Sequence, residues 1–113
     1  MFNDPTMLTI SSALSGLSAR QRTIADNVAN INTPGFLAGR VDFETALRSA
    51  VADGTGAAAP TIARSLEPTR EDGNNVNLEA ETLSNVDTGM RYALMLRAAD
   101  HHFGILRASM RTS

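Results

Sequence analysis

The sequence has no cysteine, no tryptophan and no lysine. Without cysteine, disulfide bonds and thiolate metal sites are excluded. The aromatic residues are four phenylalanines and one tyrosine in 113 residues, which leaves little bulk to fill a core. We therefore expect an elongated or partner-dependent fold, not a compact globule.

Neither positive nor negative charge dominates, because the sequence has 12 acidic residues and 10 basic ones, all of them arginine. Nucleic-acid binding needs a concentrated basic face, and none is visible. An amphipathic protein that lies on a membrane surface would carry many basic residues on the polar faces of its helices. In this sequence acidic and neutral residues share the polar faces, which argues against such a protein. Direct membrane insertion is not expected, since no run of about 18 apolar residues occurs. Residues 1–5 also lack the pattern of a cleavable signal.

A long helix is predicted over residues 4–32. Asp4-Pro5 fits an N-cap followed by proline at the first helical position. The helix should end before Pro34, and Pro34-Gly35 fits the two central positions of a type II turn. Apolar residues along the helix recur at steps of four and three, with Gln21 interrupting, which is a heptad seam typical of helix pairing. The seam consists of Ile10, Leu14, Leu17, Ile24, Val28 and Ile31.

A second long helix is predicted over residues 76–111, with Asn75 or Asn77 as its cap. Its seam is again spaced by four and three. It consists of Tyr92, Leu96, Ala99, Phe103, Leu106 and Met110, and Leu83, Val86 and Met90 extend the apolar surface. Two seams predict a mainly α fold in which the two terminal helices pack as an antiparallel, coiled-coil-like hairpin.

Residues 33–75 are expected to form a corner, a short element and a flexible connector within a single domain, 1–113. Residues 41–44 alternate like a strand, while Phe43, Ala46 and Leu47 also fit a short helix ending near Val51. We favour the short helix. Residues 53–68 are small and lack apolar periodicity, so they predict a mobile or extended connector. Residues 72–75, Asp-Gly-Asn-Asn, predict a turn.

Three glycines, Gly16, Gly89 and Gly104, lie inside the predicted helices. Each costs roughly 1 kcal/mol relative to alanine there. Either another group approaches closely at these points, or the weakness is tolerated.

No motif for catalysis or cofactor binding stands out. Neighbouring His101 and His102 point about 100° apart on a helix and lack the i, i+4 spacing of a zinc pair, so no metal site is expected. One histidine should face a neighbouring group and the other water. Glu79 and Glu81 diverge on a helix and suit its positive end better than acid–base chemistry. The sequence therefore favours a structural protein over an enzyme.

Residues 25–36 resemble the N-terminal signature of flagellar rod and hook proteins. The corner within it consists of Asn27, Asn30, Asn32, Thr33, Pro34, Gly35 and Phe36. Residues 14–22, 41–43 and 72–81 are similar to the proximal-rod members in particular, and the last block sets them apart from the related FlgC type. This second block includes Gly73, Asn74, Asn75, Val76, Leu78, Glu79 and Glu81.

The resemblance implies a structural subunit of the proximal rod of the flagellar basal body, needed for motility. Such a subunit would be exported by the flagellar type III apparatus without a cleavable signal. It would polymerise through its terminal helices in the periplasmic rod. The implied partners are copies of itself, FlgC-type rod subunits, the adapter FliE and the MS ring. Two alternatives stay open: another axial subunit of the FlgC type, or the inner-rod protein of a different secretion system. The corner asparagines would satisfy backbone groups, touch a neighbouring subunit, or do both.

Overall fold

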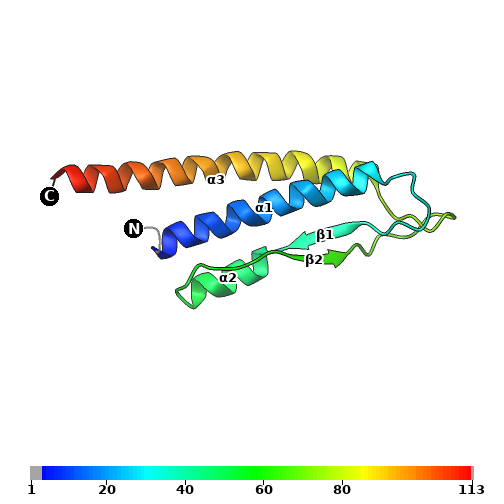
Figure 1. Cartoon of the computed structure of the whole chain (residues 1–113), viewed down its shortest axis with the longest axis horizontal. Coiled ribbons are helices and arrows are strands. Elements are labelled where there is room, and N and C mark those ends of the chain that lie inside the picture. Colours follow the sequence, from blue (N-terminus) through cyan, green and yellow to red (C-terminus); the bar gives the residue numbers. More distant parts are fainter. Residues whose placement is uncertain (1–3, 113) are drawn as a thin grey trace.

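The computed structural model describes residues 4–112. The elements follow the order α1 (Pro5–Ala29), β1 (Gly39–Asp42), α2 (Glu44–Ala52), β2 (Thr61–Arg64) and α3 (Leu78–Thr112). The molecule is elongated, with extents of 66 × 25 × 15 Å (Figure 1). The elongated shape expected from the few aromatic residues is thus confirmed.

Helices α1 and α3 form the predicted antiparallel hairpin: α1 runs toward the loops at one end of the molecule, and α3 returns beside it (Figure 1). Asp4 caps α1 by accepting a hydrogen bond from the Thr6 amide. The helix ends at Ala29, three residues earlier than predicted, because residues 30–32 already turn toward the corner. Over residues 4–112, no helix has the length and apolar character needed to cross a membrane.

The middle segment is more ordered than predicted. Both alternatives for residues 41–51 occur in succession, as strand β1 and then helix α2. The predicted connector, residues 53–68, contains β2, which pairs antiparallel with β1 from Thr61 opposite Asp42 to Arg64 opposite Gly39. This strand could not be predicted from the sequence, because β2 is only four residues long and has no buried face. Its apolar residue Ile62 is 70 % exposed. We call the unit formed by β1, α2 and β2 the arm.

Helix α1 is the middle layer, with α3 on one side and the arm on the other (Figure 1). The Phe43 ring of the arm packs against Gly16 of α1. The guanidinium group of Arg20 lies 4.9 Å from the centre of the same ring and donates to the Val41 carbonyl at 2.8 Å. It also pairs with Glu44 at 2.6 Å. A small core joins all three layers, and its members are Leu17, Ala19, Val41 and Phe43, with Leu47, Tyr92 and Met95 packed against them.

The packed face of α3 differs from the predicted one only near the start of the helix, since Tyr92 of the predicted seam packs against the core. Thr88 is fully buried and Met95 joins the core, whereas Leu96 of the predicted seam is 45 % exposed. Leu83, Val86 and Met90, predicted to extend the packed surface, are 73 %, 57 % and 69 % exposed. Near the start of α3 the inward positions are small or polar, so a rule that places apolar residues inside selects the wrong side of the helix there.

The contact of Phe43 with Gly16 yields a prediction. A Cβ atom at Gly16 would lie 2.6 Å from two carbons of the Phe43 ring. Gly16→Ala should therefore destabilise the chain by about 1–3 kcal/mol, despite the better helix propensity of alanine. The midpoint of urea unfolding, followed by helical circular dichroism, measures the change.

Gly89→Ala is the matched control. A Cβ atom there meets nothing within 4 Å, so this variant should be stabilised by up to about 1 kcal/mol. Equal effects of the two alanines would contradict the close packing of Phe43 on α1.

Candidate functional site

The two signature blocks, far apart in sequence, meet at the corner end of the molecule. We define the corner end as residues 30–36 together with residues 67–79. Asn74 is fully buried and its side-chain amide donates to the carbonyls of Asn30 and Thr33 at 2.8 and 2.9 Å. Its side-chain oxygen accepts from the Val76 amide at 2.8 Å. One side chain thus satisfies backbone groups on both sides of the corner, where no regular ladder can do so.

Two more buried asparagines bind the arm and the segments that flank it. Asn27, 1 % exposed, forms a pair of 2.9 Å hydrogen bonds with the amide and the carbonyl of Gly39. Asn75, 4 % exposed, accepts from the Ala38 amide at 2.6 Å and donates to the carbonyls of Ser65 and Glu67. The side-chain amide of Asn27 therefore pairs with the backbone of Gly39 as the peptide group of a neighbouring strand would.

Backbone contacts and one arginine complete the corner. The turn from Thr33 to Phe36 has the hydrogen bond and the positive φ, 75° at Gly35, of a type II turn. The Gly35 amide donates to the Asp72 carbonyl at 2.7 Å, and Gly73, also at positive φ, lies against Gly35. Arg70 donates to the carbonyls of Val76 and Ile31. Arg70 was not predicted, because an isolated arginine in a loop gives no sequence signal.

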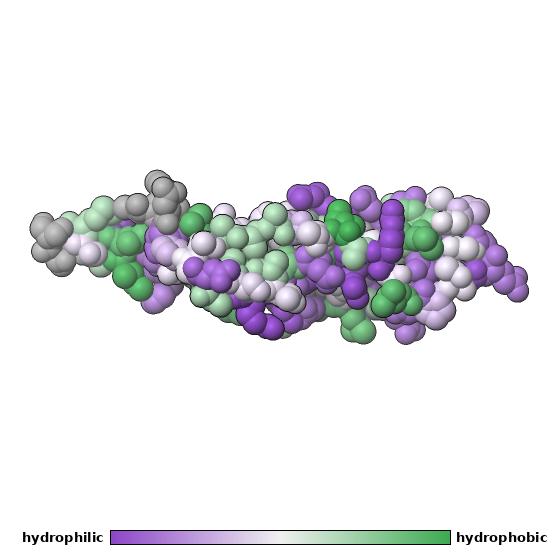
Figure 2. Space-filling model, turned by 90° about the horizontal axis from the view of Figure 1, so that it is seen from below, coloured by the Kyte–Doolittle hydropathy of each residue, from purple (hydrophilic) through white to green (hydrophobic). Residues whose placement is uncertain are grey.

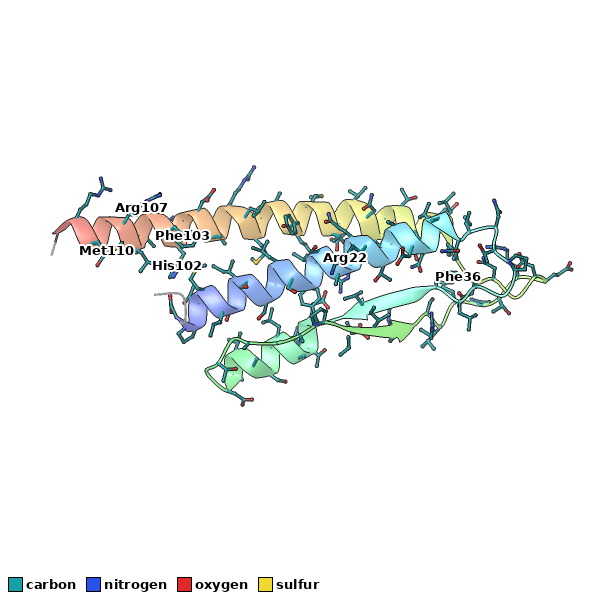
Figure 3. The ribbon with its side chains drawn as sticks, viewed as in Figure 1. Arg22, Phe36, His102, Phe103, Arg107 and Met110 are labelled. Atoms are coloured by element: carbon teal, nitrogen blue, oxygen red, sulfur yellow. The ribbon has the colours of Figure 1, made fainter. Side chains whose placement is uncertain are left out.

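The other signature residues have simpler surroundings. Asn30 donates to the Asp26 carbonyl, and Thr33 donates to Asn30. Asn77, not Asn75, caps α3 by accepting from the Ala80 amide at 3.2 Å. Val76 is buried, Phe36 is half-buried at the corner end (Figure 3), and six members are exposed. These are Asn32, Thr33, Pro34, Gly35, Leu78 and Glu79.

Two carboxylates reach into this network: Asp72 accepts from the Asn74 backbone amide at 3.0 Å, and Glu81 contacts Asn27. The Oε1 atom of Glu81 accepts from Asn27 at 3.0 Å. Burial raises the pKa of Glu81 above its ordinary value, and the Asn27 hydrogen bond opposes this only in part. Glu44 has the opposite balance, since burial is outweighed by Arg20 and nearby backbone amides, which lower its pKa.

The predicted seams divide into three groups. Ile10, Leu17 and Ile24 are buried inside the molecule. Val28, Leu96 and Met110 are exposed, at 39 %, 45 % and 55 %. The remaining members are half-buried, and they are Leu14, Ile31, Tyr92, Ala99, Phe103 and Leu106. The hairpin thus covers only part of the surface assigned to assembly.

At the opposite end of the molecule, His102 of α3 contacts Asp4, the N-cap of α1. His102 Nε2 lies 2.7 Å from Asp4 Oδ2, and Figure 3 shows His102 directed toward the start of α1. His101 is exposed. No group of three potential metal ligands is found among residues 4–112.

Comparison with known proteins gives consistent results. A family model described as "Flagella basal body rod protein" matches residues 7–36. The chain is 30 % identical over 110 residues to the flagellar basal body rod protein FlgB of Borrelia hermsii, covering 77 % of this chain and 82 % of that protein. It is 31 % identical over 108 residues to FlgB of Escherichia coli K12, with 76 % and 78 % covered.

The buried amide of Asn74 yields the first prediction for the corner. Asn74→Asp replaces a double donor by a carboxylate that faces the Asn30 and Thr33 carbonyls. We expect a loss of about 2–3 kcal/mol in the free energy of unfolding, measured by urea denaturation. Asn32→Asp, the same change at an exposed position of the same corner, should cost less than about 0.5 kcal/mol. Similar losses in both variants would refute the proposed role of Asn74.

Glu81 yields a pH-dependent prediction. Because its pKa is raised in the folded chain, the folded state binds this proton more tightly than the unfolded state does. The contribution of Glu81 to stability is therefore most favourable below its ordinary value of 4.5 and declines as pH rises through the folded pKa. Glu81→Gln keeps an oxygen for Asn27, so its stability relative to wild type should increase from pH 4 to pH 8.

The exposed Glu79→Gln is the control for Glu81→Gln. It removes a charge at the positive end of α3 without touching Asn27, so it should be slightly destabilising at neutral pH. If Glu81→Gln were destabilised relative to wild type at pH 8, burial would not dominate the electrostatics of Glu81.

Proposed function

Because this chain belongs to the flagellar basal body rod protein family, and within it to the FlgB group, we propose that it polymerises through α1 and α3 to build the proximal rod. The chain is a structural subunit of the flagellar basal body rod. In the proposal, residues 1–113 act as one rod-subunit domain beside the MS ring. Its neighbours are further copies, FlgC-type subunits and the adapter FliE. Export by the flagellar type III apparatus and a periplasmic position belong to the same proposal.

The outward face of α3 carries this proposal. Leu83, Val86, Met90 and Leu94 follow one another at steps of three and four residues, so they lie on one face of the helix. All four are more than half exposed, Leu94 at 61 %. We call this set the outer stripe. The side of α3 that packs against α1 lies roughly opposite, which leaves the outer stripe without cover from α1.

A contiguous apolar stripe on a soluble chain is costly unless another surface covers it. The arm and the segment after it also expose apolar side chains, among them Val51, Ile62 and Leu66. On the face that includes the arm, however, strongly apolar groups stand apart among hydrophilic ones (Figure 2). Scattered exposure of that kind is ordinary for a protein surface. The outer stripe, repeated along a helix, is the surface best suited to a neighbouring helix.

The proposal is tested in a strain that lacks the gene, with variants supplied back and motility and rod recovery measured. Met90→Asp places a charge in the outer stripe without entering the hairpin, because Met90 is 69 % exposed. We expect it to be exported at the wild-type level, to be excluded from the rod and to abolish motility. Asn85→Asp, an exposed polar position on the same helix, should support normal motility.

Other outcomes would separate the parts of this proposal. If the deletion leaves flagella intact, the chain is not a rod subunit in that organism. If Met90→Asp restores motility, the outer stripe is not the assembly surface. Leu17→Asp cannot replace Met90→Asp in this test, because Leu17 is 2 % exposed and a charge there would unfold the hairpin.

A further inference from the structure

The charges of the chain are separated along its length. Residues 67–87 contain six carboxylates and one arginine, whereas residues 88–112 contain four arginines and one aspartate. The first group leads into α3 from the corner end, and the second follows α3 to the far end (Figure 1). Along residues 67–112 of a molecule 66 Å long, the charge thus changes from acidic at the corner end to basic toward the end of α3.

Stabilisation of the helix dipole accounts for only part of this separation. That effect favours acids at the N-terminus and bases at the C-terminus of a helix, but it fades within one turn. Glu67 and Glu71 precede α3 altogether, and Arg97 lies more than three turns before its end. These charges are too far from the ends of α3 to interact favourably with its dipole.

The charges concerned are exposed. At the corner end they are Glu67, Glu71 and Glu79, and on α3 they are Arg97, Arg107 and Arg111. None of the six forms an ion pair within residues 4–112. Among the other charges nearby, Asp87 pairs with Arg91, Asp72 pairs with Arg70, and Glu81 accepts a hydrogen bond from Asn27, while Asp100 is the exposed acid of residues 88–112.

Helix α3 also extends beyond the start of α1 (Figure 1). His102 lies beside Asp4 at the start of α1, and α3 continues to Thr112. Ten residues of helix correspond to roughly 15 Å. We call residues 97–111 the α3 tail. It carries three of the exposed arginines and the half-exposed apolar side chain of Ile105.

We propose that copies of this chain associate head to tail, with the basic α3 tail of one copy on the acidic corner end of the next. This inference rests on the proposed rod function and adds a direction to it. Contact between unlike ends is heterologous, so it extends into a filament instead of closing as a dimer. Repulsion between like ends disfavours the head-to-head and tail-to-tail arrangements, so charge sets the polarity of the assembly.

The test uses two charge-reversed chains. Glu71→Arg with Glu79→Arg makes the corner end basic, and Arg107→Glu with Arg111→Glu makes the α3 tail acidic. In either variant alone, the two ends now carry the same sign and repel each other. In an equimolar mixture each reversed end meets an unlike end of the other variant. Sedimentation at low salt measures association, and circular dichroism verifies that helicity is unchanged.

We expect concentration-dependent association of the wild type that weakens with salt. Each variant alone should associate about tenfold or more weakly, and the mixture should regain the wild-type level. Arg22→Glu with Arg48→Glu, which changes net charge equally at exposed positions away from both ends, should associate like the wild type. Figure 3 shows Arg22 in the middle of the molecule.

Three results would overturn the inference: a wild-type chain that stays monomeric at low salt, variants that associate normally, or a mixture that does not regain association. None of these touches the rod function itself, which the deletion strain tests separately. If that strain requires the chain while the charge variants assemble normally, the subunit is a rod protein whose polarity has another origin.

Discussion

Buried backbone groups that no helix or sheet can pair are the constraint on which this structure depends. At the corner end, the chain leaves α1, turns sharply and later returns into α3, so several amides and carbonyls lack regular partners. The side-chain amides of Asn27, Asn74 and Asn75 supply those partners, since each offers donors and an acceptor together. Asn27 joins α1 to β1, and Asn74 and Asn75 join the chain before α3 to the corner and to the segments that flank the arm.

The sequence predicted the helices well, because caps, proline and heptad spacing are local signals. Asp4, Asn77 and Pro34 mark boundaries that the structure places within a few residues. The asparagine blocks could be located for the same reason, yet their mutual contact could not, since residues 30 and 74 are joined only by the fold. Strand β2 was missed because four exposed residues carry no alternating pattern.

Near the start of α3 the packed face was mispredicted, for a reason that bears on the role of this helix. Apolar periodicity assumes that a helix turns its most apolar side inward, whereas α3 turns Thr88 inward and Met90 outward. The Thr88 hydroxyl even lacks a hydrogen-bond partner among residues 4–112, which is unfavourable in a buried position. The single chain is therefore not arranged for its own maximal stability. An arrangement of this kind is expected when covering the apolar side is left to a neighbour.

Because the two ends of the hairpin are held differently, its resistance to force should depend on the direction of the force. Sliding α1 along α3 would strain the Asn74 contacts, the Arg70 contacts and the hydrogen bond between Gly35 and Asp72 at the same moment. A force that pulls the helices apart at the other end would act first on the contact between His102 and Asp4. The remaining contacts between the helices would then bear the force one after another. Parallel loading of many weak bonds resists force far better than sequential loading. The subunit should therefore be stiff under shear along its axis and compliant to peeling from its open end.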